Sequence, residues 1–182
     1  MNGPKMIFNQ DKYNKAWKFA AIAHQKVNQT VPGTDLPYIL HVGSVAMEVI
    51  AALSIEQLDN PDLAVQCALL HDVIEDTEAT YDDVLDSFGK DVADGVNALS
   101  KDDKLPDKPA RMKDSLKRIK EQPKEVWMVK MADRITNLQP PPAHWNEDKI
   151  NNYREEARLI YDELKEGSEC LAERLFQKIN KY

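Results

Sequence analysis

The sequence predicts an all-α fold: one domain over residues 1–182, built as a bundle of about eight to ten helices. Three observations predict it. The composition is that of a globular chain, with 42% hydrophobic and 30% charged residues, and the length suffices for a buried core without disulfide staples. Glycine is scarce, at six residues. Alternating apolar and polar residues, the mark of half-buried strands, are hard to find.

The first two helices are predicted on either side of a loop. Residues 11–29 carry apolar side chains that are spaced for one buried face, namely Ala16, Phe19, Ala20 and Ala23. The stretch TVPGTDLPY (30–38) is a predicted loop, because proline and glycine interrupt regular structure there. A second helix is predicted from about His41 to Leu53.

The next two helices carry clear end signals. NPDLAVQCALLHDVIED (60–76) is predicted as one continuous helix, with Asn60 as its N-cap and Pro61 in its first position. TYDDVLDSFG follows, with Thr80 as N-cap and Gly89 as the stop. The remaining helices are predicted over 91–99, 110–121, 124–138, about 147–165 and 169–180, separated by proline, glycine and polar stretches.

Composition and charge exclude several classes of function. No apolar stretch approaches the roughly 20 residues that span a bilayer, and the N-terminus lacks the apolar core of a signal peptide. Cys67 and Cys170 match no metal or redox spacing, so we expect reduced thiols in a cytoplasmic protein. The net charge of −7 argues against nonspecific nucleic-acid binding. A small phosphorylated ligand stays compatible, because one metal ion can reverse the local field.

The stretch CALLHDVIEDT (67–77) places four ionisable residues at the end of an apolar helix. On a continuous helix His71 lies above Glu75, and Asp72 lies above Asp76. Clustered carboxylates beside a histidine need a compensating cation if they are buried, and a divalent metal would supply it. The alternative is an exposed helix end whose charges are solvated.

Two further pieces could belong to the same site. In VKMADRITNL (129–138), Asp133 and Asn137 share a helix face, and Asp133 is either a metal ligand or a surface partner of Arg134. In LPYILHVGSVA, His41 lies where a loop becomes a helix. Taken alone, His41 is more often an ordinary half-buried imidazole than a ligand.

The order of an early His, a His-Asp pair and a distant Asp resembles the HD superfamily of metal-dependent phosphohydrolases. The chain is most similar to the hydrolase domain of RelA/SpoT-type enzymes and to stand-alone small alarmone hydrolases. The matching stretches are LPYILH, ALLHDVIEDT, FGKDVADGV, SKDDKLP and VKMADRITNL, and WNEDKINNYREEA resembles the family's substrate-binding helix. Together they cover residues 15–165, and they imply a helical HD domain.

The resemblance implies a metal site and a pair of catalytic acids. The implied ligands are His41, His71, Asp72 and Asp133. The family's usual ion is Mn²⁺, and two imidazoles with two carboxylates suit such an ion while leaving positions for water and phosphate. Glu75 and Asp76 match the family's catalytic Glu-Asp pair, which would orient and deprotonate water activated by the metal.

The implied reaction is hydrolysis of the 3′-pyrophosphate of (p)ppGpp, giving GDP or GTP and pyrophosphate. Asn137 matches the family asparagine near the sugar-phosphate. Lys149 and Tyr153, four apart on one helix, match positions that hold phosphate and ribose, with an exposed helix face as the alternative. The loop NQTVPGTDLPY departs from the family because it lacks the usual Arg-Lys pair, so an adenosine alarmone such as (p)ppApp is an open alternative.

Rival functions use the same residues. A nucleoside 5′-monophosphatase of the HD superfamily could use the same four ligands, and a non-catalytic nucleotide-binding module could retain the pocket. The presence of both Glu75 and Asp76 favours an enzyme. The acidic surface and two tryptophans, Trp127 and Trp145, leave a homodimer as an option.

Overall fold

The structure, a computed structural model, describes residues 7–182, and within that range it contains ten α-helices, a short 3-10 helix and no strand. The all-α prediction is confirmed. The helices are α1 (Gln10–Lys26), α2 (Ile39–Leu53), α3 (Pro61–Leu70), α4 (Val73–Asp76), α5 (Tyr81–Phe88), α6 (Lys90–Leu99), α7 (Lys108–Lys120), α8 (Lys124–Asn137), α9 (Glu147–Leu164), η1 (Lys165–Gly167) and α10 (Glu169–Lys181). Residues 1–6, included in the predicted domain, lie outside the described range.

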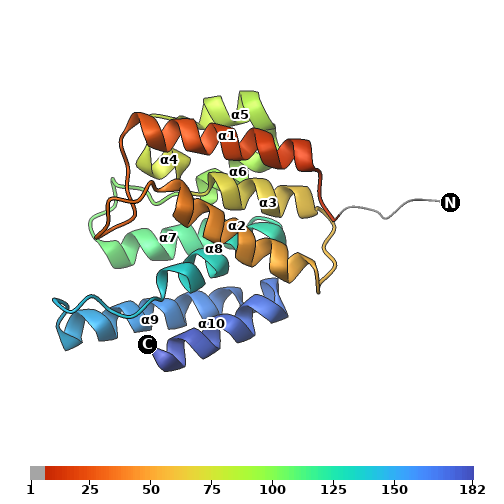
Figure 1. Cartoon of the computed structure of the whole chain (residues 1–182). Coiled ribbons are helices and arrows are strands. Elements are labelled where there is room, and N and C mark those ends of the chain that lie inside the picture. The colour runs from red at the N-terminus through yellow and green to blue at the C-terminus, as the bar shows by residue number, and fades with distance from the viewer. Residues whose placement is uncertain (1–6) are drawn as a thin grey trace.

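Two helices form the centre of the bundle. Every residue of α3 from Leu63 to Leu70 is buried, and α8 is buried along most of its length. Around them, α1 and α5 lie along one side of the bundle, at the top of Figure 1, and α9 and α10 lie along the opposite side. Helix α2 runs across the middle (Figure 1). Because α8 lies at the centre, its charged residues Lys130, Asp133 and Arg134 are buried too. Buried charges of this kind need partners or a ligand.

Local capping chemistry sets where the helices begin. The Asn60 side chain accepts a hydrogen bond from the Leu63 amide, and Thr80 forms a reciprocal capping box with Asp83, so both predicted caps are confirmed. Gly89 ends α5 at φ 87°, a left-handed conformation that glycine adopts without strain. No helix of the described chain combines the length and the apolarity needed to cross a membrane.

The predicted continuous helix over 60–76 is wrong, because the chain breaks between α3 and α4. His71 and Asp72 lie outside both helices, and Asp72 has φ −106° and ψ 0°, away from α-helical values. The expected stacking of His71 above Glu75 on one helix therefore does not apply. The turn at Asp72 redirects the two acids that follow, so they meet partners from other parts of the chain.

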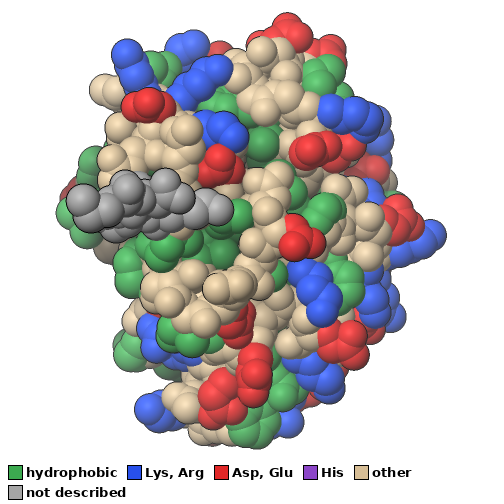
Figure 2. Space-filling model, turned by 90° about the vertical axis from the view of Figure 1, so that its right-hand side faces the viewer, with side chains coloured by type: hydrophobic (Ala, Val, Ile, Leu, Met, Phe, Trp, Pro, Cys, Tyr) green, Lys and Arg blue, Asp and Glu red, His purple; other side chains and the backbone are tan. Residues whose placement is uncertain are grey.

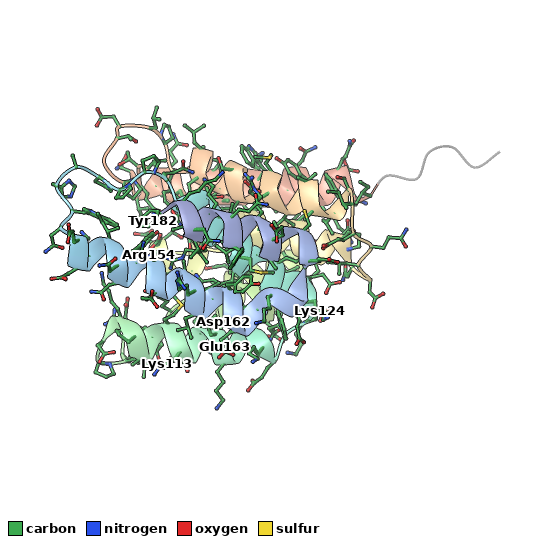
Figure 3. All side chains as sticks on the ribbon, turned by 90° about the horizontal axis from the view of Figure 1, so that it is seen from below. Lys113, Lys124, Arg154, Asp162, Glu163 and Tyr182 are labelled. Atoms are coloured by element: carbon green, nitrogen blue, oxygen red, sulfur yellow. The ribbon has the colours of Figure 1, made fainter. Side chains whose placement is uncertain are left out.

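Three of the longer loops gather at one end of the bundle. Residues 27–38, 100–107 and 138–146 lie together with α4 at the left of Figure 1. On the opposite face, basic and acidic side chains are interspersed and form no single basic patch (Figure 2). Seen from below, α7, α9 and α10 cover one side of the bundle, and Tyr182 follows the end of α10 (Figure 3).

Candidate metal centre

The four predicted ligands come together from three parts of the chain. His41 lies in the first turn of α2, His71 and Asp72 lie in the break after α3, and Asp133 lies in α8. The His71 Nε2 atom is 2.9 Å from Asp72 Oδ2 and 3.9 Å from Asp133 Oδ1. The His41 Nε2 atom is 3.4 Å from Asp133 Oδ1 and 3.9 Å from Asp72 Oδ2. Ligands about 2.1 Å from one ion at right angles are about 3 Å apart, so this spacing is of the right order.

The histidine nitrogens are prepared for an ion. The His71 Nδ1 atom lies 2.8 Å from the Ala68 carbonyl oxygen, which only accepts, so Nδ1 donates and Nε2 is the nitrogen that faces the two carboxylates. The Nε2 atoms of His41 and His71 are buried and have no hydrogen-bond partner among the described residues. His41, His71 and Asp133 are only 8%, 3% and 8% exposed. Buried imidazole nitrogens that lack a hydrogen-bond partner and converge with carboxylates fit a divalent cation.

The charges of the site are strongly coupled. Burial opposes the charged form of His71, but the adjacent Asp72 carboxylate outweighs it and raises the pKa of His71 to about 9. Burial likewise opposes ionisation of Asp133, yet the Lys130 ammonium and the two imidazoles hold its pKa well below the ordinary value. Burial opposes ionisation of Asp72 as well, but the charge of His71 holds its pKa below the ordinary value, so both aspartates are ionised at neutral pH. His71 is protonated at that pH, and a bound metal ion would take the place of its Nε2 proton.

Polar neighbours orient the ligands. The Tyr38 hydroxyl donates to Asp72 Oδ2 at 2.5 Å, Lys130 Nζ donates to Asp133 Oδ2 at 3.2 Å, and Asn137 Nδ2 donates to Asp133 Oδ1 at 2.6 Å. Sequence reasoning placed Asn137 beside Asp133 but missed Tyr38 and Lys130. The signals were available: Tyr38 precedes His41 by three residues, and Lys130 lies three residues before Asp133 on the same helix face.

The two candidate catalytic acids have different surroundings. Glu75 accepts from the Lys101 backbone amide at 2.8 Å and from Lys101 Nζ at 3.0 Å, so both of its oxygens are engaged. Asp76 Oδ2 accepts from Gln29 Nε2 at 2.8 Å. Asp76 keeps an exposed edge, but the protein atoms around its carboxyl and the charge of Asp72 raise its pKa above that of an ordinary aspartate.

The predicted substrate residues on α9 lie in an aromatic cluster. The Tyr153 ring contacts the rings of Trp145 and Tyr182, with centroids 5.4 Å and 5.6 Å apart. The Lys149 ammonium lies 4.2 Å from the Trp145 ring centroid, so the exposed Lys149 lies against the same cluster. Arg134 stacks on Tyr153 at 4.5 Å.

Arg134 forms an ion pair with a residue of α9 and not with the neighbouring Asp133. One guanidinium nitrogen contacts the Glu156 carboxylate, and the side chain is 6% exposed. The neighbouring Asp133 is not in that pair. The structural role that the sequence suggested for Arg134 therefore has a definite partner, and Asp133 is left to the metal cluster.

A sequence profile of the HD domain matches residues 16–167. The chain belongs to the HD-domain family. Among its relatives are the guanosine-3′,5′-bis(diphosphate) 3′-pyrophosphohydrolases MESH1 of Drosophila melanogaster and Mus musculus, 29% and 32% identical over 85% and 90% of each chain. The bifunctional (p)ppGpp synthase/hydrolase SpoT of Escherichia coli K12 is 41% identical over 84% of this HD-domain chain, which spans 21% of SpoT.

Solved structures of other proteins share this HD-domain fold. One, described as a metazoan ortholog of SpoT that hydrolyses ppGpp, matches the whole chain with a TM-score of 0.78 at 24% identity and is itself covered over 98% of its length. Another, lmo0812 from Listeria monocytogenes EGD-e, matches 80% of the chain with a TM-score of 0.62 at 21% identity. At these identities the likeness concerns the fold.

Proposed function

We propose that this HD-domain chain is a metal-dependent hydrolase that removes the 3′-pyrophosphate of alarmone nucleotides such as (p)ppGpp. One observation carries the proposal: His41, His71 and Asp133 each offer a ligand atom within 4.8 Å of the others, and Asp72 Oδ2 lies 3.9 Å and 2.9 Å from the Nε2 atoms of His41 and His71. Relatives that are covered over 85–90% of their length are named for this activity. The products would be pyrophosphate and GDP or GTP.

His41, His71, Asp72 and Asp133 would hold the ion, for which we propose Mn²⁺. The donor set supports this choice, because imidazole and carboxylate together suit a borderline-to-hard divalent ion. When bound, the ion supplies Lewis-acid activation of water and of a phosphate oxygen. The protein contributes ionised carboxylates, two buried imidazoles of which His71 is oriented by the Ala68 carbonyl, and a largely buried setting.

Glu75 and Asp76 would divide the proton transfers of the reaction. Hydrolysis consumes one water, breaks the bond between the ribose 3′-oxygen and phosphorus, and requires a proton on that leaving oxygen. Glu75, with both oxygens fixed by Lys101, is suited to orient the attacking water. Asp76, whose pKa is raised, is suited to carry a proton at its carboxyl.

The nucleotide would lie between the metal cluster and α9. Asn137, the last residue of α8, lies next to the metal cluster, because its side-chain amide donates to the ligand Asp133. Lys149 supplies a charge for phosphate, and Tyr153 supplies an aromatic surface for the ribose. The loop 30–38 lacks a basic residue, so the assay below includes an adenosine alarmone.

The test is a product analysis. The purified chain, stripped with EDTA and supplied with Mn²⁺, is incubated in parallel with ppGpp, pppApp and a deoxynucleoside monophosphate, and the products are resolved by anion-exchange chromatography. We expect pyrophosphate from an alarmone, no turnover by His71→Ala, and full turnover by the matched control His144→Ala, whose exposed histidine lies outside the site. Orthophosphate from the monophosphate alone would overturn the proposal in favour of a nucleotidase.

A further inference from the structure

A hydrogen-bonded chain leads from α1 to a candidate catalytic acid. The His24 Nδ1 atom is 2.6 Å from Gln29 Oε1, and Gln29 Nε2 is 2.8 Å from Asp76 Oδ2. His24 lies in the last turn of α1, Gln29 in the loop that follows, and Asp76 at the end of α4. The bond from Gln29 thus joins two segments 47 residues apart in sequence, directly beside the metal cluster.

The chemistry of the three groups allows one orientation of the Gln29 amide. An ionised carboxylate only accepts hydrogen bonds, so the amide NH₂ of Gln29 faces Asp76. The amide oxygen then faces His24, and since that oxygen only accepts, His24 Nδ1 is the donor. A rotated amide would place two acceptors against each other at Asp76. The Asp76 carboxylate therefore determines the orientation of the Gln29 amide, and His24 Nδ1 complements it as the donor.

His24 is a rigid anchor for this arrangement. The side chain is 2% exposed, and its ring lies 4.9 Å from the Tyr38 ring, centroid to centroid. The backbone turns back at Asn28, which has φ 51°, a left-handed conformation that asparagine tolerates. The Gln29 backbone amide then donates to the His24 carbonyl at 3.1 Å, and the Gln29 side chain reaches the Nδ1 atom of the same histidine.

The two acids differ in what holds them. Lys101 donates hydrogen bonds to both oxygens of Glu75. The Asp76 carboxylate, by contrast, accepts a single hydrogen bond within the described residues, the one from Gln29. Asp76 is also partly exposed, so packing alone does not define its rotamer. Its position relative to the metal cluster therefore depends on Gln29.

We propose that Gln29 is a positioning residue for Asp76 and that the hydrogen bond to His24 holds the Gln29 side chain in place. The inference rests on the proposed hydrolytic function. Gln29 acts through Asp76 and touches no metal ligand in the hydrogen bonds of the described residues. Its loss should slow the chemical step while leaving the affinity for metal and for substrate unchanged.

The first experiment measures kcat, KM and Mn²⁺ affinity of Gln29→Met, which keeps the length of the side chain and removes both hydrogen bonds. We expect kcat to fall by about 10- to 100-fold, as is typical when a group that orients a reacting residue is lost. KM and the affinity for Mn²⁺ should stay within about twofold of wild type, a much smaller change than the one expected in kcat. The matched control is Gln25→Met. Gln25 is an exposed residue in the last turn of α1, and it lines a cavity of about 440 Å³ together with Gln29.

A double-mutant cycle separates positioning from general support of the fold. In an Asp76→Ala background, Gln29→Met should change kcat by less than about twofold, because the residue through which it acts is gone. An equal loss in both backgrounds, or an unchanged kcat of the single variant, would overturn the inference and leave the proposed function intact. Full activity of Asp76→Ala itself would instead remove the proposed role of Asp76, and the inference with it.

Discussion

His71 shows how a single side chain is prepared for a metal ion. Its Nδ1 donates to the Ala68 carbonyl, its Nε2 faces two carboxylates, and the ring is almost fully buried. Asp72 is similarly held by the Tyr38 hydroxyl. The second hydrogen bonds of His71, Asp72 and Asp133 set the directions of these side chains before an ion arrives, which reduces the cost of binding.

Substitutions in the cluster should separate ligands from catalytic acids. We expect His71→Ala and Asp72→Ala to lose Mn²⁺ binding and turnover together, because each removes a ligand from a buried site. Glu75→Ala should retain metal affinity while the rate falls by about 10²- to 10⁴-fold, the usual contribution of an acid-base group. Titration calorimetry with Mn²⁺ and the pyrophosphate assay measure the two properties. Full turnover by Glu75→Ala would refute the role given to Glu75.

The buried His24 should make stability depend on pH. Burial lowers the pKa of His24 below 6.5, so below that pH the unfolded chain binds more protons at this position than the folded chain. Its contribution to stability is therefore present above pH 6.5 and is lost as the pH falls toward the folded-state pKa. The difference in unfolding free energy between wild type and His24→Gln should shrink from pH 8 to pH 5. Urea unfolding in EDTA measures it, and a difference that is constant or grows on acidification would contradict this account.

Among the elements, α6 comes very close to α3 and α8 at Gly95. A Cβ atom at Gly95 would lie 2.8 Å from Cys67 Sγ and 3.0 Å from Val126 Cγ2. Distances this short require the neighbours to move, and both neighbours are fully buried. Gly95 therefore serves helix packing, at some cost in helix propensity.

We expect Gly95→Ala to destabilise the fold. Overpacking typically costs about 1–3 kcal/mol, which exceeds the gain of about 0.5–1 kcal/mol from alanine in a helix. Denaturant unfolding measures the net loss. The double variant Gly95→Ala/Cys67→Ala should recover part of it, because the smaller side chain frees space for the new methyl group. Equal or higher stability of the single variant would show that the helices can separate without cost.

The break between α3 and α4 is the feature of the elements that matters most for function. His71 keeps helical dihedral angles (φ −55°, ψ −32°) at the end of α3, whereas the backbone departs from them at Asp72, and both side chains reach the cluster formed with α2 and α8. Glu75 and Asp76 then lie in a short helix of four residues, where Lys101 and Gln29 hold them.

For the molecule as a whole, the metal site connects three segments that are distant in sequence. An ion bound by residues of α2, the α3–α4 break and α8 would stabilise the folded state only, because the unfolded chain does not keep these residues together. The α3–α4 break and the beginning of α2 lie at the end of the bundle where the three loops gather (Figure 1). Helices α9 and α10 lie along one side of the bundle (Figure 3).

Metal addition should therefore raise global stability. With Mn²⁺ at a hundredfold excess over its dissociation constant, the free energy of unfolding should rise by about 2.7 kcal/mol, and EDTA should reverse the rise. Asp133→Asn should remove this increment, while the exposed control Asp86→Asn should keep it. Urea titrations with and without metal provide the measurement. A rise that Asp133→Asn retains would place the bound ion elsewhere.

The sequence by itself determined the helical elements and the identity of the candidate site residues. Helix periodicity, caps such as Asn60 and Thr80, and stops such as Gly89 act over a few residues, so they can be recognised locally. The ordered His, His-Asp and Asp pattern indicated the HD-domain family, which the match over residues 16–167 confirms. The metal, the substrate contacts and the single-domain assignment stay predictions.

Only the tertiary structure decided how these residues are held. The turn at Asp72 and the contacts of Tyr38, Lys101 and Gln29 join segments 26 to 47 residues apart. No local pattern encodes such pairs, because each residue is compatible with several surroundings and the packing of the whole bundle selects one. The ligands could thus be named from their order in the chain, whereas the partners that orient them depend on which helices pack together.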